Sequence, residues 1–410
     1  MSASLAPPSA TAPPADANLS PRQVLMVAIA CGVIVANLYF AQPLIGLIQG
    51  DIHLPPAAAG FIVTLTQIGY GLGLLLIVPL GDLLENRRLI ITALLSSLLA
   101  LLALASSQDA SSFLAAAFLI GLTCVSAQVL VPYAAQLAPA ATRGETVGKV
   151  MSGLLLGIML ARPVSSLLAH ALGWRAVFVT AAVGVVALAV AIRATLPART
   201  PPARSSGPLL PRYAGLLASM ATLLRETPLL RRRAAYHATM FGAFSLFWTV
   251  VPLLLMSPRF GFSQNGVALF ALAGVAGAIA APVAGRAADR GHTRMGTLLA
   301  LSAGSISFVL PWLVPGWNGI VLALLVAAGI LLDMGVSANL VLSQRAIYAL
   351  GDEHRSRLNG LFMAIFFAGG AVGSALGGWA WAHGGWAWTS AFGAVLPLLA
   401  LGYYLTEPRT

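Results

Sequence analysis

The sequence predicts an all-α membrane protein of twelve membrane-spanning helices in two related six-helix halves. Three observations lead to this prediction. The composition is apolar along nearly the whole chain, long apolar runs alternate with short basic loops, and segments of the second half repeat segments of the first. Each observation limits what the protein can be.

Composition indicates that the bilayer is the solvent of this chain. Hydrophobic residues make up 59% of the 410 residues and charged residues only 9%, whereas a soluble domain carries roughly 25% charged residues. The mean hydropathy is +0.88. The net charge of +11 comes from basic residues scattered singly between apolar runs, so we expect no nucleic-acid partner. No metal-ligand cluster or phosphate-binding motif appears, so we expect no metal, no cofactor and no enzymatic activity.

The long apolar runs divide into twelve candidate spans, each bounded by charges or by Pro and Gly turns. The first six lie near residues 24–48, 58–81, 89–107, 111–138, 148–171 and 174–195. The other six lie near residues 234–256, 263–285, 295–314, 318–347, 357–382 and 386–405. A lipid bilayer is therefore an expected partner of the whole chain.

Two stretches between or before these spans differ in composition. Residues 1–21 are rich in Ala, Pro and Ser and predict a disordered cytoplasmic tail. Residues 196–233, rich in Pro, Ser and Arg, predict a solvated cytoplasmic linker. The linker separates an N-terminal half, residues 22–195, from a C-terminal half, residues 234–410.

The basic residues predict the orientation of the spans. Lys and Arg accumulate on the cytoplasmic side of a membrane because they resist translocation. With twelve spans, twenty of the 23 Lys and Arg residues fall on one side, Arg175 and Arg259 fall on the other, and Arg162 lies inside a span. We therefore expect both termini in the cytoplasm.

An internal repeat supports the division into halves, since transporters are commonly built from duplicated units around a midplane site. Three pairs of segments match at nearly one offset and in equivalent places: Asp82 with Asp289, Val125-Ser126-Ala127-Gln128 with Val336-Ser337-Ala338-Asn339, and Gly173-Trp174 with Gly385-Trp386.

The loops around these two acids resemble the signature loop of the major facilitator superfamily. The first copy runs from Val78 to Arg88, and the second, Gly285 to Arg294, is closer to the family pattern. An acid at a helix end and neighbouring arginines can pair across the two halves and latch one conformation. The candidate gating residues are therefore Asp82, Arg87, Arg88, Asp289, Arg290 and Arg294.

Two further segments resemble particular members of that superfamily. Span five, with Gly153, Gly157, Ala161 and Pro163, is similar to the family's antiporter signature, and Arg162 stands directly before the proline. The segment Asn37 to Pro43 is similar to the first span of bacterial efflux-type members. The resemblance implies a major facilitator fold of two pseudo-symmetric bundles and a place in the bacterial inner membrane.

One acid and one base lie deep inside the predicted spans. Asp333 and Arg162 are each about 18 to 20 Å from the inner boundary, at 1.5 Å per residue counted from Arg345 and Lys149. Because a charge at that depth costs at least ~2.5 to 3.5 kcal/mol, an idle aspartate there is unexpected. We expect Asp333 to alternate between pairing with Arg162 and accepting a proton; a static pair that only orders the bundle is the alternative.

The resemblance also implies a substrate pocket lined by spans one, four, seven and ten. Polar candidates there are Asn37, Gln42, Gln128 and Asn339. Span seven adds a stripe on one helical face, formed by Phe241, Phe244 and Trp248. Each of these residues can instead pack or cross-link helices.

Together these features predict a monomeric secondary transporter of a small organic molecule, working by alternating access. Efflux of the molecule against proton entry is the preferred function. A proton symporter or uniporter for uptake, a membrane sensor without transport activity and an intramembrane enzyme are the alternatives. The sequence does not identify the substrate.

Overall fold

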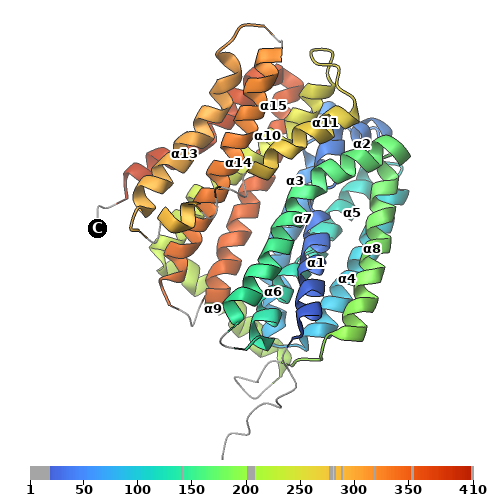
Figure 1. The fold of residues 1–410 in the computed structure, drawn as a ribbon, viewed down its shortest axis with the longest axis vertical. Coiled ribbons are helices and arrows are strands. Elements are labelled where there is room, and N and C mark those ends of the chain that lie inside the picture. The colour runs from blue at the N-terminus through green and yellow to red at the C-terminus, as the bar shows by residue number, and fades with distance from the viewer. Residues whose placement is uncertain are drawn as a thin grey trace, which may run out of the picture.

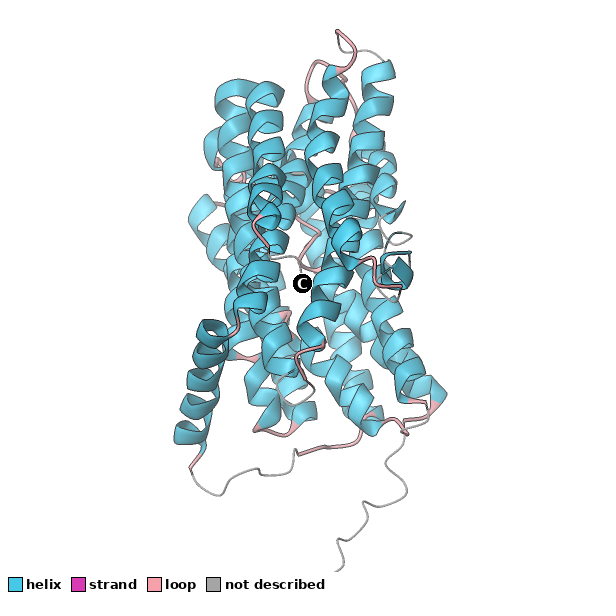
Figure 2. Ribbon diagram, turned by 90° about the vertical axis from the view of Figure 1, so that its left-hand side faces the viewer, coloured by secondary structure: helices cyan, strands magenta, loops and turns pink. Residues whose placement is uncertain are grey.

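The computed structural model describes residues 19–139, 142–200, 208–276, 280, 283–287, 290–316, 319–351 and 355–407. Two helical bundles lie side by side, with most helix axes along the long direction of the molecule (Figure 1). The described residues form helices joined by loops, with no strand among them (Figure 2). The predicted all-α fold is confirmed.

The N-terminal bundle contains the first six predicted spans. Spans one and two are each broken into three pieces, and span four into two pieces. In chain order the helices are α1 Pro21–Ala36, η1 Gln42–Leu44, α2 Ile45–Asp51, η2 Pro56–Ala58, α3 Phe61–Leu76, η3 Val78–Asp82, α4 Asn86–Ser106, α5 Ala110–Thr123, α6 Ser126–Leu137, α7 Arg143–Leu172 and α8 Trp174–Thr195.

The C-terminal bundle contains the other six predicted spans. Its helices are α10 Pro228–Met256, α11 Gln264–Ala271, η4 Leu272–Ala276, α13 Thr293–Val309, η5 Leu310–Trp312, α14 Gly319–Tyr348 and α15 Arg355–Leu405. Span eight comprises α11, η4 and the helical residues 283–287, and residues 277–279 and 281–282 of that span lie outside the described residues.

Lengths and hydropathy agree with twelve membrane crossings. In the described part of the chain, nine helices are long and apolar enough to cross a membrane. One of them, α15, has 51 residues, which is too long for a single crossing because about 20 residues span the hydrocarbon core. Gly385 divides α15 into two crossings, since its φ of 56° and ψ of −143° are not helical. The broken spans one and eight complete the set.

The two Gly-Trp pairs found in the sequence occupy equivalent places in the two bundles. Gly173 has φ 85° and separates α7 from α8, which begins at Trp174. Gly385 also has a positive φ and precedes Trp386 in α15. Only glycine adopts this backbone region readily, so both pairs mark the turn into the last helix of a half. The other repeat is less regular, because Ser126 follows a break before α6 whereas Ser337 lies within the continuous α14.

The described part of the segment between the bundles contains a helix, which the sequence analysis did not predict. Residues 209–226 form helix α9, and α10 begins at Pro228. Met220 of α9 packs with Leu230 and Phe362 in a small apolar cluster of the C-terminal half. The Tyr213 hydroxyl donates to the carbonyl of Leu76 in the N-terminal half, at 2.8 Å. The apolar residues of α9 explain this packing, and composition alone did not reveal it.

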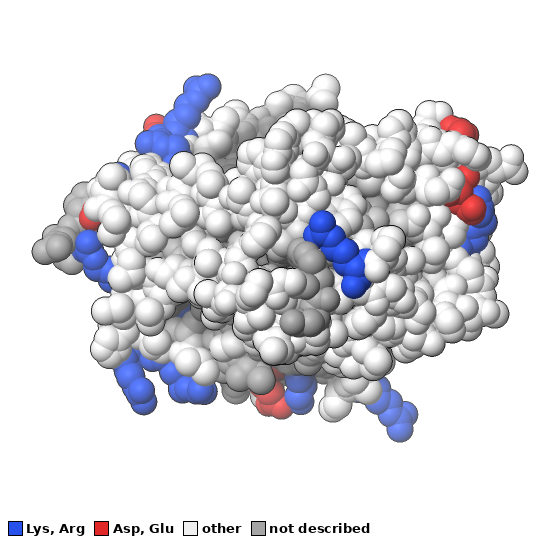
Figure 3. Space-filling model, turned by 90° about the horizontal axis from the view of Figure 1, so that it is seen from above, with Lys and Arg blue, Asp and Glu red and all other residues white. Residues whose placement is uncertain are grey.

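The surface of the bundles is apolar where lipid is expected. Large hydrophobic side chains stand exposed on the outward faces of helices in both halves, among them Leu25, Leu99, Val183, Leu299 and Val372. Figure 3 shows the molecule from above: the face is mostly uncharged, and most of the visible charged side chains lie around its rim. Among the described residues this arrangement fits a hydrocarbon solvent.

Glycines bring helices of the N-terminal half into close contact. A Cβ on Gly153 of α7 would collide with the backbone of Ala28 in α1, and a Cβ on Gly157 with the backbone of Gly32. Small residues allow this kind of approach between membrane helices. The glycines that resemble the antiporter signature therefore fix α7 against α1, which positions Arg162 further along α7.

Glycines also bring the two halves together, at the end where α3 begins. A Cβ on Gly378 of α15 would collide with the backbone of Gly60, and a Cβ on Gly60 with the carbonyl of Ser374. The approach of α3 to α15 at this end therefore depends on the absence of side chains at both positions.

We expect Gly378→Val to keep the halves apart at this end, because its side chain would overlap the Gly60 backbone. Labelling of a Thr64→Cys reporter by a membrane-impermeant maleimide measures the separation, since Thr64 is buried here. The rate should rise several-fold. Gly402→Val is the matched control, because nothing lies within 4 Å of its Cβ position. Equal labelling in the two valine variants would contradict this account.

Candidate functional site

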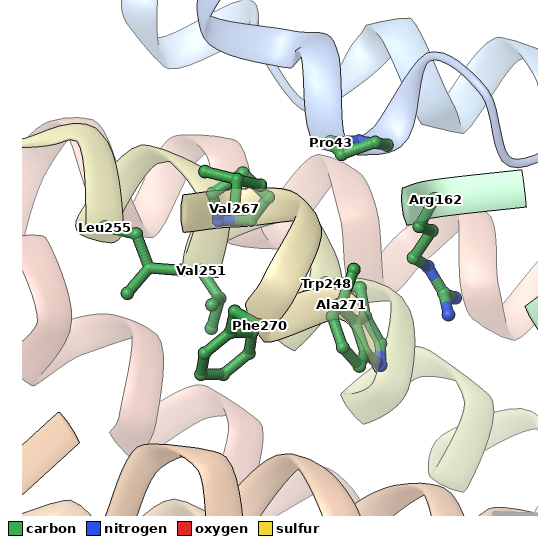
Figure 4. A pocket seen from close by; sticks show the side chains of 9 residues that line it. Pro43, Arg162, Trp248, Val251, Leu255, Val267, Phe270 and Ala271 are labelled. Carbon is green, nitrogen blue, oxygen red and sulfur yellow. The ribbon is translucent and has the colours of Figure 1, made fainter. Parts of the chain in front are cut away.

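The two charges predicted inside the spans, Arg162 and Asp333, lie between the two halves. Their side chains are near each other but are not among the ion pairs within 4.0 Å that the described residues form. Arg162 comes from α7 of the N-terminal half, and Asp333 comes from α14 of the C-terminal half. Both side chains are buried, with 3% and 5% of their surface exposed. Figure 4 shows Arg162 directed toward Trp248 of α10. The structure therefore brings together three residues that the sequence singled out.

Arg162 is held by one hydrogen bond and three aromatic rings. Its Nε donates to Oε1 of Gln42 at 2.8 Å. Its guanidinium carbon lies 4.4 Å from the centre of the Trp248 ring, 5.0 Å from that of Phe244 and 5.3 Å from that of Tyr39. Cation–π contacts of this kind gain strength when they are desolvated. The aromatic rings thus replace part of the water that the arginine loses on burial.

Asp333 is held by the same tryptophan. The Trp248 Nε1 donates to Oδ1 of Asp333 at 2.9 Å. One indole therefore contacts the arginine through its face and the aspartate through its N–H. A buried tryptophan N–H usually finds an acceptor, and here the acceptor is the carboxylate that the sequence predicted to be functional.

Gly274 of η4 leaves the space that the two charges share. A Cβ at this position would lie 2.8 Å from Oδ2 of Asp333, 3.2 Å from Trp248 and 3.6 Å from Nη1 of Arg162. The carboxylate and the guanidinium are therefore near neighbours on either side of this glycine. Any side chain at position 274 would fill the gap between them.

A pocket adjoins this cluster on the side of the α10 C-terminus. It is a narrow cavity of about 10 Å³, which is room for a single water molecule. Arg162 is the charged residue of its lining, and the remaining lining residues are Pro43, Trp248, Val251, Pro252, Leu255, Val267, Phe270 and Ala271 (Figure 4). The surface that these residues present to the cavity is apolar.

The aromatic stripe of span seven divides between the site and the helix packing. Phe244 and Trp248 both contact Arg162. Phe241 instead stacks on Phe366 of α15, with ring centres 3.8 Å apart. The stripe thus contributes two of its three rings to the arginine.

The other polar candidates lie away from Arg162. Gln128 donates from Nε2 to the Tyr70 hydroxyl at 3.1 Å. Asn339 is fully buried and bonds to Nδ1 of His237 at 3.0 Å, within the C-terminal half. Asn37 is 4% exposed at the end of α1. Gln42 alone among the four contacts the arginine directly.

Two candidate gating residues of the first half, Arg87 and Arg88, have local partners. Arg87 donates to the carbonyl of Leu196 at 2.9 Å, and Arg88 lies 3.5 Å from the Glu85 carboxylate. Asp82 ends η3. These bonds do not cross between the halves. In the second half, Arg290 and Arg294 are exposed, and Asp289 lies outside the described residues.

A polar network between the halves was not predicted from the sequence. Gln67 of α3 donates to the hydroxyl of Ser245 in α10 at 2.5 Å. The Thr64 hydroxyl lies 2.8 Å from that of Ser374 in α15. Thr64 and Gln67 are three positions apart, which places them on one face of α3. That spacing was the available signal for a polar face directed at the other half.

Two apolar bundles with a buried charge on each side of their interface define a polytopic membrane transporter. A family model described as Major Facilitator Superfamily matches residues 27–347. The chain is also 41% identical, over 94% of its length and 95% of the relative's, to a protein of Escherichia coli O157:H7 called uncharacterized transporter YgaY. A probable transporter of Streptomyces coelicolor is 35% identical over 94% of this chain and 86% of that protein.

The chain therefore belongs to the Major Facilitator Superfamily, a family of transporters rather than enzymes. A solved structure supports the fold. It is the crystal structure of a bacterial homolog of the human lysosomal transporter Spinster, in an inward-facing and unoccupied conformation. It matches with a TM-score of 0.72 at 14% identity, covering 96% of this chain and all of that one.

We expect Trp248→Phe to lower the stability of the protein, because the substitution keeps a ring beside Arg162 but removes the N–H that Asp333 accepts. A buried acceptor left without its donor costs about 1–3 kcal/mol. Thermal unfolding of the purified protein in detergent measures the loss. Trp388→Phe, at an indole that is 45% exposed, is the control. A Trp248→Phe protein as stable as this control would show that the bond does not matter.

Proposed function

We propose that this transporter exports a small organic molecule by alternating access and exchanges it for protons, which bind to Asp333. The observation that carries the proposal is the place of this carboxylate. It is buried between the halves, bonded to Trp248 and next to Arg162. Among the described residues, Asp333 is the one acidic residue whose side chain is buried.

The energetics of burial support a functional role. A charged side chain at the centre of a bilayer costs at least ~2.5 to 3.5 kcal/mol, and such residues usually lie on ion or substrate pathways. Burial disfavours the charged form of a carboxyl group, and a nearby guanidinium favours it. A carboxyl group subject to both influences changes protonation when its distance from the guanidinium or its access to water changes.

The position of the charges couples this change to movement of the halves. Arg162 belongs to the N-terminal half, whereas Trp248 and Asp333 belong to the C-terminal half. A charged Asp333 attracts Arg162 and favours contact between the halves at mid-depth. A protonated Asp333 loses most of that attraction, so proton binding shifts the balance between conformations.

The charge distribution of the sequence supports a further part of the proposal. We infer a position in the bacterial inner membrane with both termini in the cytoplasm, since Lys and Arg concentrate on the side of the termini. A monomer is the proposed state, because the two halves form the proposed site within one chain. The proposed direction of transport, efflux, is based on a resemblance: the segment from Asn37 to Pro43 is similar to the first span of bacterial efflux-type members.

We expect Asp333→Asn to abolish transport driven by a pH gradient and to preserve exchange of substrate at equal pH, because the amide keeps the shape but carries no proton. A compound found by screening a deletion strain for altered tolerance serves as the substrate. Its flux is measured in vesicles of purified protein with an imposed gradient. Asp109→Asn, at an exposed helix cap, is the matched control.

The direction of flux in the same vesicles separates export from its alternative. Accumulation against the proton gradient supports exchange, whereas movement with the protons identifies a symporter. Undiminished proton-driven flux in Asp333→Asn would remove Asp333 from the mechanism.

A further inference from the structure

Two buried hydrogen-bond donors beside the proposed proton site have no partner among the described residues. They are Nη2 of Arg162 and Nε2 of Gln42. Both side chains are nearly inaccessible to solvent, with 3% and 1% exposed. They also belong to residues that bond to each other, from Arg162 Nε to Gln42 Oε1. An unpaired buried donor costs free energy, so the pair is suited to a ligand that supplies an acceptor.

The surroundings of this donor pair are aromatic. The rings of Trp248, Phe244 and Tyr39 lie within 5.3 Å of the guanidinium carbon. The adjoining pocket adds Phe270 and otherwise aliphatic side chains. Such walls accommodate a flat apolar group by stacking and by exclusion of water. A ligand that uses both features carries an acceptor oxygen on a planar ring.

The charges of the site select among such ligands. In the described part of the interface, Arg162 and Asp333 are the ionised groups near the pair, and they balance each other when Asp333 is charged. A carboxylate ligand would then add a second negative charge in a medium of low dielectric constant, at a large cost. A neutral carbonyl oxygen satisfies the donors and leaves the charge balanced.

We propose that Arg162 and Gln42 bind the carbonyl oxygen of a neutral substrate with a planar ring, and that the ring stacks on Trp248 in a conformation in which the two halves have separated. The proposal rests on the proposed function, since exchange requires that the substrate bind while Asp333 is unprotonated. It adds a substrate class, and it assigns Gln42 a direct contact with the substrate.

Three probes of similar shape test the charge of the substrate: benzamide, which is neutral, benzoate, which is an anion, and benzylamine, which is a cation. Binding to the purified full-length protein is measured by saturation-transfer NMR. We expect benzamide to bind most tightly. Tighter binding of benzoate or benzylamine would overturn the assignment of a neutral substrate, and binding of none of the three would overturn the site.

Variants of the donor pair test the contact itself. Gln42→Leu removes one donor and should weaken benzamide binding roughly tenfold. Arg162→Lys keeps the charge but loses the planar donor geometry, and should weaken benzamide binding by a similar factor. Gln344→Leu is the matched control, since Gln344 bonds to Asn359 near the end of α14. Binding unchanged in both Gln42→Leu and Arg162→Lys would contradict the proposal.

Asp333→Asn separates this proposal from the proposed function. The amide leaves Arg162 without its balancing charge, so benzoate should bind more tightly relative to benzamide than it does in the wild type. This shift depends only on the charges of the site and not on transport. Unchanged preference would overturn the charge argument, whereas retained proton coupling in the vesicle assay would overturn only the role of Asp333 as the proton carrier.

Discussion

The arrangement of Arg162, Trp248 and Asp333 is the interaction on which the rest of the structure depends. Two opposite charges are buried near one another, and the indole of Trp248 contacts both of them. Isolated charges in this environment would be costly, so each one requires the other and the tryptophan. Because the arginine and the carboxylate come from different halves, their attraction acts across the interface that must open and close during transport.

Small residues let the helices come close enough to position these three side chains. Gly153 and Gly157 bring α7 against α1, so that Arg162 reaches Gln42 in the broken part of span one. Gly274 leaves the gap in which the guanidinium and the carboxylate approach each other.

At the end where α3 begins, Gly60 and Gly378 allow the halves to touch. The same interface holds buried hydroxyl and amide groups of both halves, which bond across it. A contact of small residues and hydrogen bonds can form and separate without breaking a packed apolar core.

The sequence predicted much of the fold because hydrocarbon imposes strong constraints on a chain. Long apolar runs, basic loops and the Gly-Trp turns predicted the helices, and Asp333 and Arg162 were evident as charges inside apolar runs. What the sequence did not reveal depends on three-dimensional packing. Whether Phe241 faces Arg162 or Phe366 depends on the tilt of α10. The partners of Arg87 depend on where the chain leaves α8, and helix α9 was hidden by the Pro and Ser residues that precede it.

The central claim is that Asp333 gains and loses a proton as the site changes. Infrared difference spectroscopy of the purified protein tests it most directly, because a protonated carboxyl group has a carbonyl stretching band that a carboxylate lacks. We expect a band that appears as the pH is lowered, that shifts when benzamide is added and that is absent from Asp333→Asn. A spectrum in which Asp333→Asn shows the same pH-dependent and benzamide-sensitive band as the wild type would contradict it.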